Sequence, residues 1–238
     1  RALDRYPNYV EALQDRAVIS KKQGKPDQAI QDLNRALDLE PNNPYLLVQR
    51  AWIHFHEGRT GPAIQDAQRA ADISQSSDLT EESYREQLSS AQSALAYFHL
   101  SGNELDRAIE LAEQAVRLNS RNLDAHYVKG RVLLDKGQID QAIISFDEAI
   151  KLNPNGAAIY WYRSKSWQKK GDTVRERSDR EQAIRLDPSF ATKDAPPPPI
   201  KLPEPAPVRN PPPKLPDTSV SFRKSVVGKG MVMTVGYH

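Results

Sequence analysis

The chain has 238 residues and no cysteine, which excludes disulfides and thiolate metal sites and fits a reducing cytoplasm as well as a periplasm. Its 33 basic and 31 acidic residues leave a net charge of −2 over residues 1–190 and +4 from residue 191 onward, so no basic field on the longer part favours nucleic-acid binding. No apolar run approaches the ~18 residues of a membrane span, and we expect a soluble protein, cytoplasmic or periplasmic.

Most of the chain repeats one pattern, two short amphipathic helices joined by a turn. Residues 123–156 show it most clearly, because apolar residues recur at helical spacing, Gly137 interrupts the period, and a second stripe begins at Ile139. Neither helix of such a hairpin can bury its apolar stripe alone, so we expect copies to stack. Two residue types recur in register, glycines at Gly24, Gly58, Gly102, Gly137 and Gly171, and alanines at Ala36, Ala70, Ala115, Ala149 and Ala183.

This register divides the chain into successive units. Ala2 and Pro7 stand 34 residues before Ala36 and Pro41, so we interpret residues 1–9 as the remnant of an upstream repeat. Over residues 10–190 we predict five units, 10–43, 44–77, about 78–122, 123–156 and 157–190.

The third unit carries eleven extra residues. We expect ten of them to precede Gly102 and to lengthen the first helix to about 79–101, with Asp78 and Glu81 forming a capping box. The eleventh is expected between Gly102 and Ala108. Ten residues add ~15 Å of helix, so the beginning of this helix should project past its neighbours unless it bends over an edge.

The last unit differs from the others in its second helix. Glu176 and Arg180 stand where the fourth unit has Ala142 and Phe146. A terminal repeat needs a soluble outer face, so we interpret this polar helix as a cap and expect the array to end near Pro188.

The remaining residues have a different composition. Eleven of the twenty-two residues from Ala195 to Pro216 are proline, which predicts an extended linker over 191–217. Residues 218–238 alternate around Gly228 and Gly230, which predicts a β-hairpin or the start of another domain. The basic charge of this tail also fits docking on the array or on a second copy of the chain.

The 34-residue step, with its small, aromatic and proline positions, resembles the tetratricopeptide repeat. The family's glycine, alanine, aromatic and final proline correspond to Gly130, Ala142, Phe146 and Pro154, while His126 and Lys129 replace its usual tryptophan and leucine. The resemblance covers about 10–190. It implies an all-α fold, a right-handed α-solenoid of tandem helix-turn-helix repeats, whose first helices line a concave groove for a peptide or a partner helix.

The resemblance also places candidate binding residues on the first helices. The predicted lining pairs aromatic with basic groups, which suits an acidic partner segment that contains aromatic residues. For Trp52 and Phe55, packing against the adjacent unit is an equal alternative to exposure in the groove. The family's lysine and asparagine clamp for an acidic chaperone tail has no match, since Gln14 and Val18 occupy its first positions. The candidates are Trp52, Phe55, Tyr127, Arg131, Leu134, Trp161, Lys165 and Lys169.

No pattern in the sequence predicts catalysis, a metal or a cofactor. The five histidines are scattered, no glycine-rich phosphate loop occurs, and His54 and His56 diverge around a helix because they stand two residues apart. We therefore expect a non-enzymatic, bacterial-type scaffold for protein interactions. The alternative is the targeting or regulatory arm of a larger enzyme whose catalytic domain lies outside this sequence.

Overall fold

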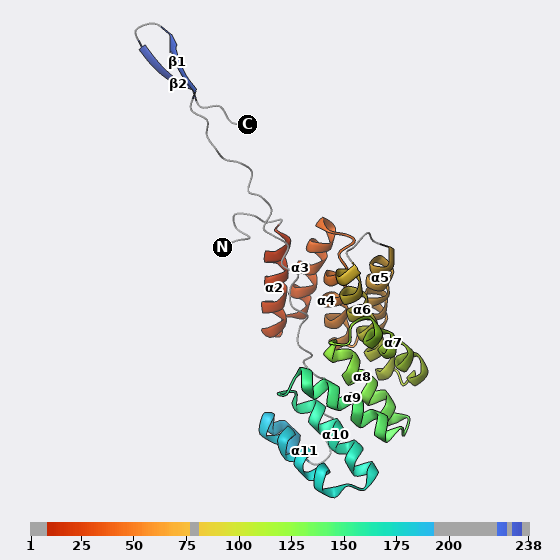
Figure 1. Cartoon of the computed structure of the whole chain (residues 1–238). Helices are drawn as coiled ribbons and strands as arrows, with labels where there is room; N and C mark the ends of the chain where they lie inside the picture. The colour runs from red at the N-terminus through yellow and green to blue at the C-terminus, as the bar shows by residue number, and fades with distance from the viewer. Residues whose placement is uncertain (1–8, 77–80, 193–222, 228–229, 235–238) are drawn as a thin grey trace. The chain divides into compact units, whose positions relative to one another are not determined.

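The computed structural model describes residues 9–76, 81–192, 223–227 and 230–234. Its described helices form hairpins in succession along the chain (Figure 1), which confirms the predicted all-α array. The first helices of the hairpins are α2 (Val10–Lys22), α4 (Pro44–His56), α6 (Glu81–Ser101), α8 (Leu123–Asp135) and α10 (Ala157–Lys170). The second helices are α3 (Pro26–Leu39), α5 (Thr60–Ser76), α7 (Leu105–Leu118), α9 (Ile139–Leu152) and α11 (Thr173–Leu186), and the 3-10 helix η1 (Pro188–Ala191) follows them.

Each hairpin packs against the next one. Helix α6 contacts α4 and α8, and α8 contacts α10, so that these first helices form a continuous row. The second helices pack chiefly on the first helices of their own hairpin and of the next one. Such neighbour-to-neighbour stacking is the arrangement of an α-solenoid. We call the face formed by α4, α6, α8 and α10 the first-helix face.

Small residues let the helices of each hairpin approach closely. Gly130 of α8 shows why, because a Cβ atom there would lie 2.7 Å from a ring carbon of Phe146, itself a fully buried side chain of α9. The recurring alanines form two fully buried columns, the set already described, Ala36, Ala70, Ala115, Ala149 and Ala183, and a second set in the same register, Ala29, Ala63, Ala108 and Ala142.

The turn of the third hairpin differs from the prediction. Four of the predicted turn glycines have a left-handed backbone, with φ of 72 to 82°, but in the third hairpin Asn103 takes this conformation, with φ of 60°, instead of Gly102. Asparagine tolerates the left-handed region better than other non-glycine residues. Since Asn103 stands 34 residues before Gly137, no extra residue separates this turn from Ala108, and the expected insertion there is wrong.

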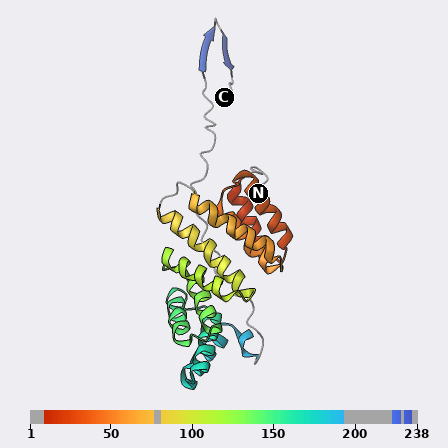
Figure 2. The same cartoon turned by 90° about the vertical axis from the view of Figure 1, so that its right-hand side faces the viewer.

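The eleven extra residues instead lengthen two helices that run side by side (Figure 2). Helix α5 has 17 residues where α3, α7 and α9 have 14, and α6 has 21 where α4 and α8 have 13. The long first helix is thereby confirmed, although Asp78 of its predicted cap lies outside the described residues. Leu88 is buried and Tyr84 packs against the core, so much of the added segment belongs to the core instead of projecting from it.

The array ends on a small separate core. In α11 only Asp179 and Ala183 are buried, as expected of a polar terminal helix. The Phe190 ring of η1 packs on the Trp161 ring of α10, with 5.5 Å between centroids. The packed structure therefore extends past Pro188, because an aromatic residue two positions later closes the end of the core.

The two described strands belong to a second unit of the chain. In it, β1 (Arg223–Val227) pairs antiparallel with β2 (Gly230–Thr234), and Arg223 is the partner of Thr234. The predicted remnant, up to residue 8, and the predicted linker, from residue 193, lie outside the described residues. None of the described helices is both long and apolar enough to cross a membrane.

Candidate functional site

The first-helix face carries a row of aromatic side chains on α4 and α6. Trp52 and Phe55 are half-buried, and their ring centroids lie 5.1 and 4.6 Å from that of Phe98. Trp52 also lies 5.2 Å from the ring of Tyr97. Aromatic pairs at such separations stabilise packing. Both side chains thus pack against the adjacent unit while part of their surface stays exposed, and their role in binding stays a prediction.

The guanidinium of Arg131 lies between three tyrosine rings from three helices. Its Cζ atom is 5.7 Å from the ring centroid of Tyr97 on α6, 5.8 Å from Tyr127 on α8 and 4.7 Å from Tyr162 on α10. Each ring attracts the cation through its π face. The Nε atom of Arg131 is buried and has no hydrogen-bond partner among the described residues. Buried donors without a partner are uncommon and costly, so Arg131 has hydrogen-bonding capacity that this face does not satisfy.

Three of the predicted groove residues are buried in the core. The prediction that their side chains are exposed in the groove is therefore wrong. Tyr127 is 1% exposed because Tyr162 of the next first helix covers it, with 5.8 Å between ring centroids, and burial raises its pKa well above the ordinary value. Trp161 is 4% exposed beneath Phe190. Leu134 is 5% exposed.

The two predicted lysines lie beside these buried residues. The Nζ atom of Lys165 is 4.9 Å from the ring centroid of Trp161, which agrees with the expected pairing of aromatic and basic groups. Lys169 donates a hydrogen bond to the carbonyl oxygen of Leu134 at 3.3 Å. Lys165 is half-buried and Lys169 is exposed, so both cations of α10 remain accessible.

Asp124 was not among the predicted site residues; it precedes Tyr127 by three residues on α8. Its Oδ1 atom is buried without a hydrogen-bond partner among the described residues, while the residue as a whole is half-buried. Burial raises the pKa of this carboxyl from 3.8 to about 7. The sequence did indicate this position, because an acidic residue seven positions before Arg131 falls on the same side of the helix.

The histidines of α4 provide no metal site. Burial lowers the pKa of His54 and of His56, and Lys21 adds to the effect at His56, so both rings are expected to be neutral at pH 7. Among the described residues, no group of three or more His, Asp or Glu side chains is placed to hold a metal ion.

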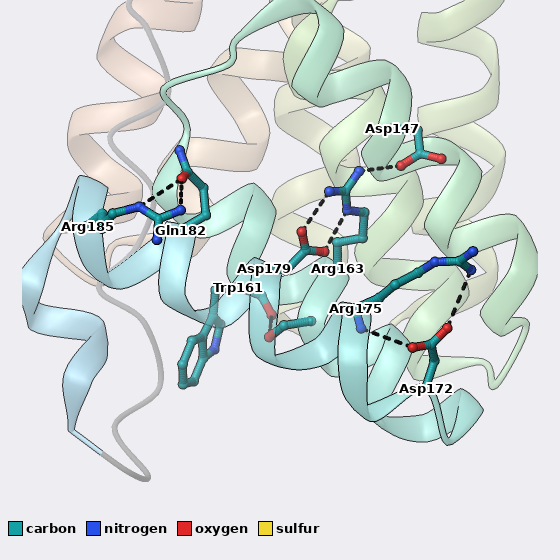
Figure 3. Close-up of polar contacts among 9 residues, drawn as sticks. Asp147, Trp161, Arg163, Asp172, Arg175, Asp179, Gln182 and Arg185 are labelled. Atoms are coloured by element: carbon teal, nitrogen blue, oxygen red, sulfur yellow. Dashed lines mark hydrogen bonds and ion pairs between the residues drawn. The ribbon is translucent and has the colours of Figure 1, made fainter.

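A recurring arginine joins neighbouring helices, and sequence reasoning missed it. Arg163 of α10 donates to Asp179 of α11 through Nε and Nη2, each at 2.7 Å, and to Asp147 of α9 through Nη1 at 2.5 Å (Figure 3). Although burial alone would lower the pKa of Arg163, its hydrogen bonds to the two carboxylates raise it. Both aspartates stand 16 residues from the arginine, one on each side.

The same arrangement occurs in other units, and we call it the arginine ladder. Arg50 bonds Asp66 and Asn34, again 16 residues away on either side, and Arg16 bonds Asp32. In the third unit, two buried leucines, Leu95 and Leu111, hold the positions of the arginine and its aspartate. Because the ladder recurs at equivalent positions of the first, second and fifth units and its partners satisfy one another, we assign it to stacking and not to ligand binding.

Comparison with known proteins identifies the fold. Two family models, both described as tetratricopeptide repeat, match residues 10–43 and 93–157. Similar solved structures include TTC0263, a thermophilic TPR protein in Thermus thermophilus, with a TM-score of 0.60 and 20% identity over 76% of this chain and 97% of that one. A structure from the functional characterization of Pseudomonas aeruginosa PilF has a TM-score of 0.62 and 19% identity over 79% of this chain and 80% of that one.

A third similar structure is MamA 41-end from Desulfovibrio magneticus RS-1, with a TM-score of 0.55 and 16% identity over 76% of this chain and 96% of that one. At such identities the likeness concerns the fold alone. No curated protein matches the sequence. The matched segments, the 34-residue step and the stacked hairpins show that the chain contains an array of tetratricopeptide repeats.

Proposed function

We propose that the chain is a protein-interaction scaffold that holds a segment of a partner protein on its first-helix face. The observation that carries this proposal is the combination, on one face, of half-buried aromatics and of Arg131, whose Nε atom has no described hydrogen-bond partner. Binding energy at protein interfaces is concentrated on a few side chains in well-packed pockets, most often Trp, Tyr and Arg. The half-buried Trp52 and Arg131 meet this description.

The charges of the face favour an acidic partner segment. Arg131 and Lys165 lie on adjacent first helices and stay partly accessible, and Lys169 is exposed beyond them. Complementary charge speeds association and excludes partners of the wrong sign. The chain's own tail from residue 191 has a net charge of +4, so it suits this cationic stretch less well than an acidic segment of another protein. The exposed edges of Trp52 and Phe55 would contact an aromatic residue of the same segment.

The test compares the proteins captured by three forms of the full chain. These are the wild type, a double variant Trp52→Ala with Phe55→Ala, and the control Ile144→Ala, whose side chain is 61% exposed on the second helix α9. We expect a partner that binds the wild type and the control but not the double variant. Because Trp52 and Phe55 also pack on α6, each form is first melted by circular dichroism, and binding is measured well below the lowest melting temperature. Equal capture by all three forms would place the binding site elsewhere.

A further inference from the structure

We propose that Asp124 recognises a cationic group of the partner, so that the bound segment carries a lysine, an arginine or a terminal amine beside the acidic group that Arg131 binds. This inference rests on the proposed function of the first-helix face and specifies the chemistry of its ligand. A partner with one charge of each sign, held at two points of one helix, would be fixed in direction as well as in position.

The placement of the two charges on α8 comes from the helix itself. Steps of three and four residues return to the same side of an α-helix, so Asp124, Tyr127 and Arg131 share one side of α8. Tyr127 and Arg131 meet the Tyr162 ring of α10, and Arg131 also meets the Tyr97 ring of α6. Asp124 therefore belongs to the side of α8 that is turned toward the other first helices. Seven residues of helix separate the two charges by ~10 Å.

The carboxyl of Asp124 has an acceptor oxygen that a cation could use. One oxygen of Asp124 is buried without a described hydrogen-bond partner, and withdrawing such a group from water without a replacement partner is costly. Burial raises its pKa, and the charge of no described residue contributes to the shift. Because the residue is only half-buried, a partner's ammonium or guanidinium group can still approach it.

Asp124 lies in the first turn of α8, where the helix dipole favours an acidic residue, but neither capping nor the repeat gives its buried oxygen a partner. Asn122 already caps α8, since its side-chain oxygen accepts a hydrogen bond from the Ala125 amide at 3.1 Å. The repeat does not require a carboxylate either, because the corresponding residues of the other four units are Glu11, Tyr45, Ser90 and Ala158.

The experiment selects ligands from a phage-displayed library of random short peptides on the immobilised full chain. Selection is repeated on Asp124→Asn, on Arg131→Met, and on the control Asp38→Asn, an exposed acid of the second helix α3. We expect the wild type and the control to enrich peptides with a basic and an acidic residue at a fixed separation. Asp124→Asn should lose only the basic preference, and Arg131→Met only the acidic one.

A selected peptide is then titrated in solution against each form. Replacing its basic residue by norleucine should weaken binding to the wild type about tenfold, as expected for a partly buried ion pair, and leave binding to Asp124→Asn unchanged. A wild-type selection without a basic preference, or an equal loss on both forms, overturns this inference and leaves the proposed function standing. If no peptide is enriched, or if enriched peptides bind Arg131→Met and Trp52→Ala as tightly as the wild type, the proposed function itself fails.

Discussion

Replacing Asp124 by asparagine should stabilise the protein at high pH and change little at low pH. The substitution keeps the shape of the side chain and replaces the ionisable carboxyl by an amide, which does not titrate. In the folded chain the pKa of Asp124 is about 7, against an ordinary value of 3.8, so the folded state retains a proton that the unfolded chain releases. The unfolding free energy of the wild type therefore falls as the pH rises from about 4 to about 7, whereas the variant lacks this contribution.

The size of the effect follows from the same two pKa values. A difference between 3.8 and about 7 corresponds to roughly 4 kcal/mol of unfolding free energy once the carboxyl is ionised in both states. Because the residue is half-buried, water screens part of this cost, and we expect the variant to gain about 2 kcal/mol at about pH 8.5.

Urea denaturation of the wild type and of Asp124→Asn, followed by circular dichroism at about pH 5 and about pH 8.5, measures this difference. The other titrating groups are common to both forms, so the change of the difference with pH reports on Asp124. The exposed control Asp38→Asn should show no such change. An advantage of the variant that is the same at both pH values, or a variant that is less stable at high pH, would refute the reasoning.

Three further predictions concern the core. Tyr127→Ala should lower the unfolding free energy by about 3–5 kcal/mol because the side chain is fully enclosed. An unchanged melting temperature would mean that this side chain is not part of the core. Gly130→Ala should lower the unfolding free energy, measured by urea denaturation, by about 1–3 kcal/mol because the added methyl group clashes with Phe146. Adding Phe146→Leu, which introduces a smaller side chain, should recover part of this loss. Arg163→Met should cost about 3 kcal/mol because Asp179, 6% exposed, loses its partner, and adding Asp179→Leu should restore stability, which a thermal melt would show.

The periodicity of the sequence located the hairpins because one physical requirement recurs at each step. A small residue must stand wherever two helices touch, and the buried alanine columns mark these places. The predictions that were wrong concern local backbone geometry, which periodicity does not describe. Gly102 and Asn103 both suit a turn, and the choice between them is made by the backbone hydrogen bonds from Asn103 to Leu100 and from Glu104 to His99.

The candidate site was harder to predict because its burial depends on residues outside each repeat. The grouping of Arg131 with tyrosines could be read from its own unit, but Tyr127 is covered by Tyr162 of the next unit. Trp161 is likewise covered by Phe190, which lies past the point where the repeat pattern stops. A pattern within one unit cannot show which neighbour encloses a side chain.

The arginine ladder restricts the length of the connection between neighbouring units. Each complete rung reaches back 16 residues across the connection to the preceding hairpin, so a longer connection would pull Arg50 or Arg163 away from its earlier partner. In the third unit Leu95 takes the place of the arginine, and α5 and α6, the two helices on either side of the connection before this unit, carry the eleven extra residues. Apolar contacts have no fixed direction and adapt to the longer helices α5 and α6. We expect insertions engineered between α3 and α4, or between α9 and α10, to be tolerated only after the arginine of that rung is replaced by an apolar residue.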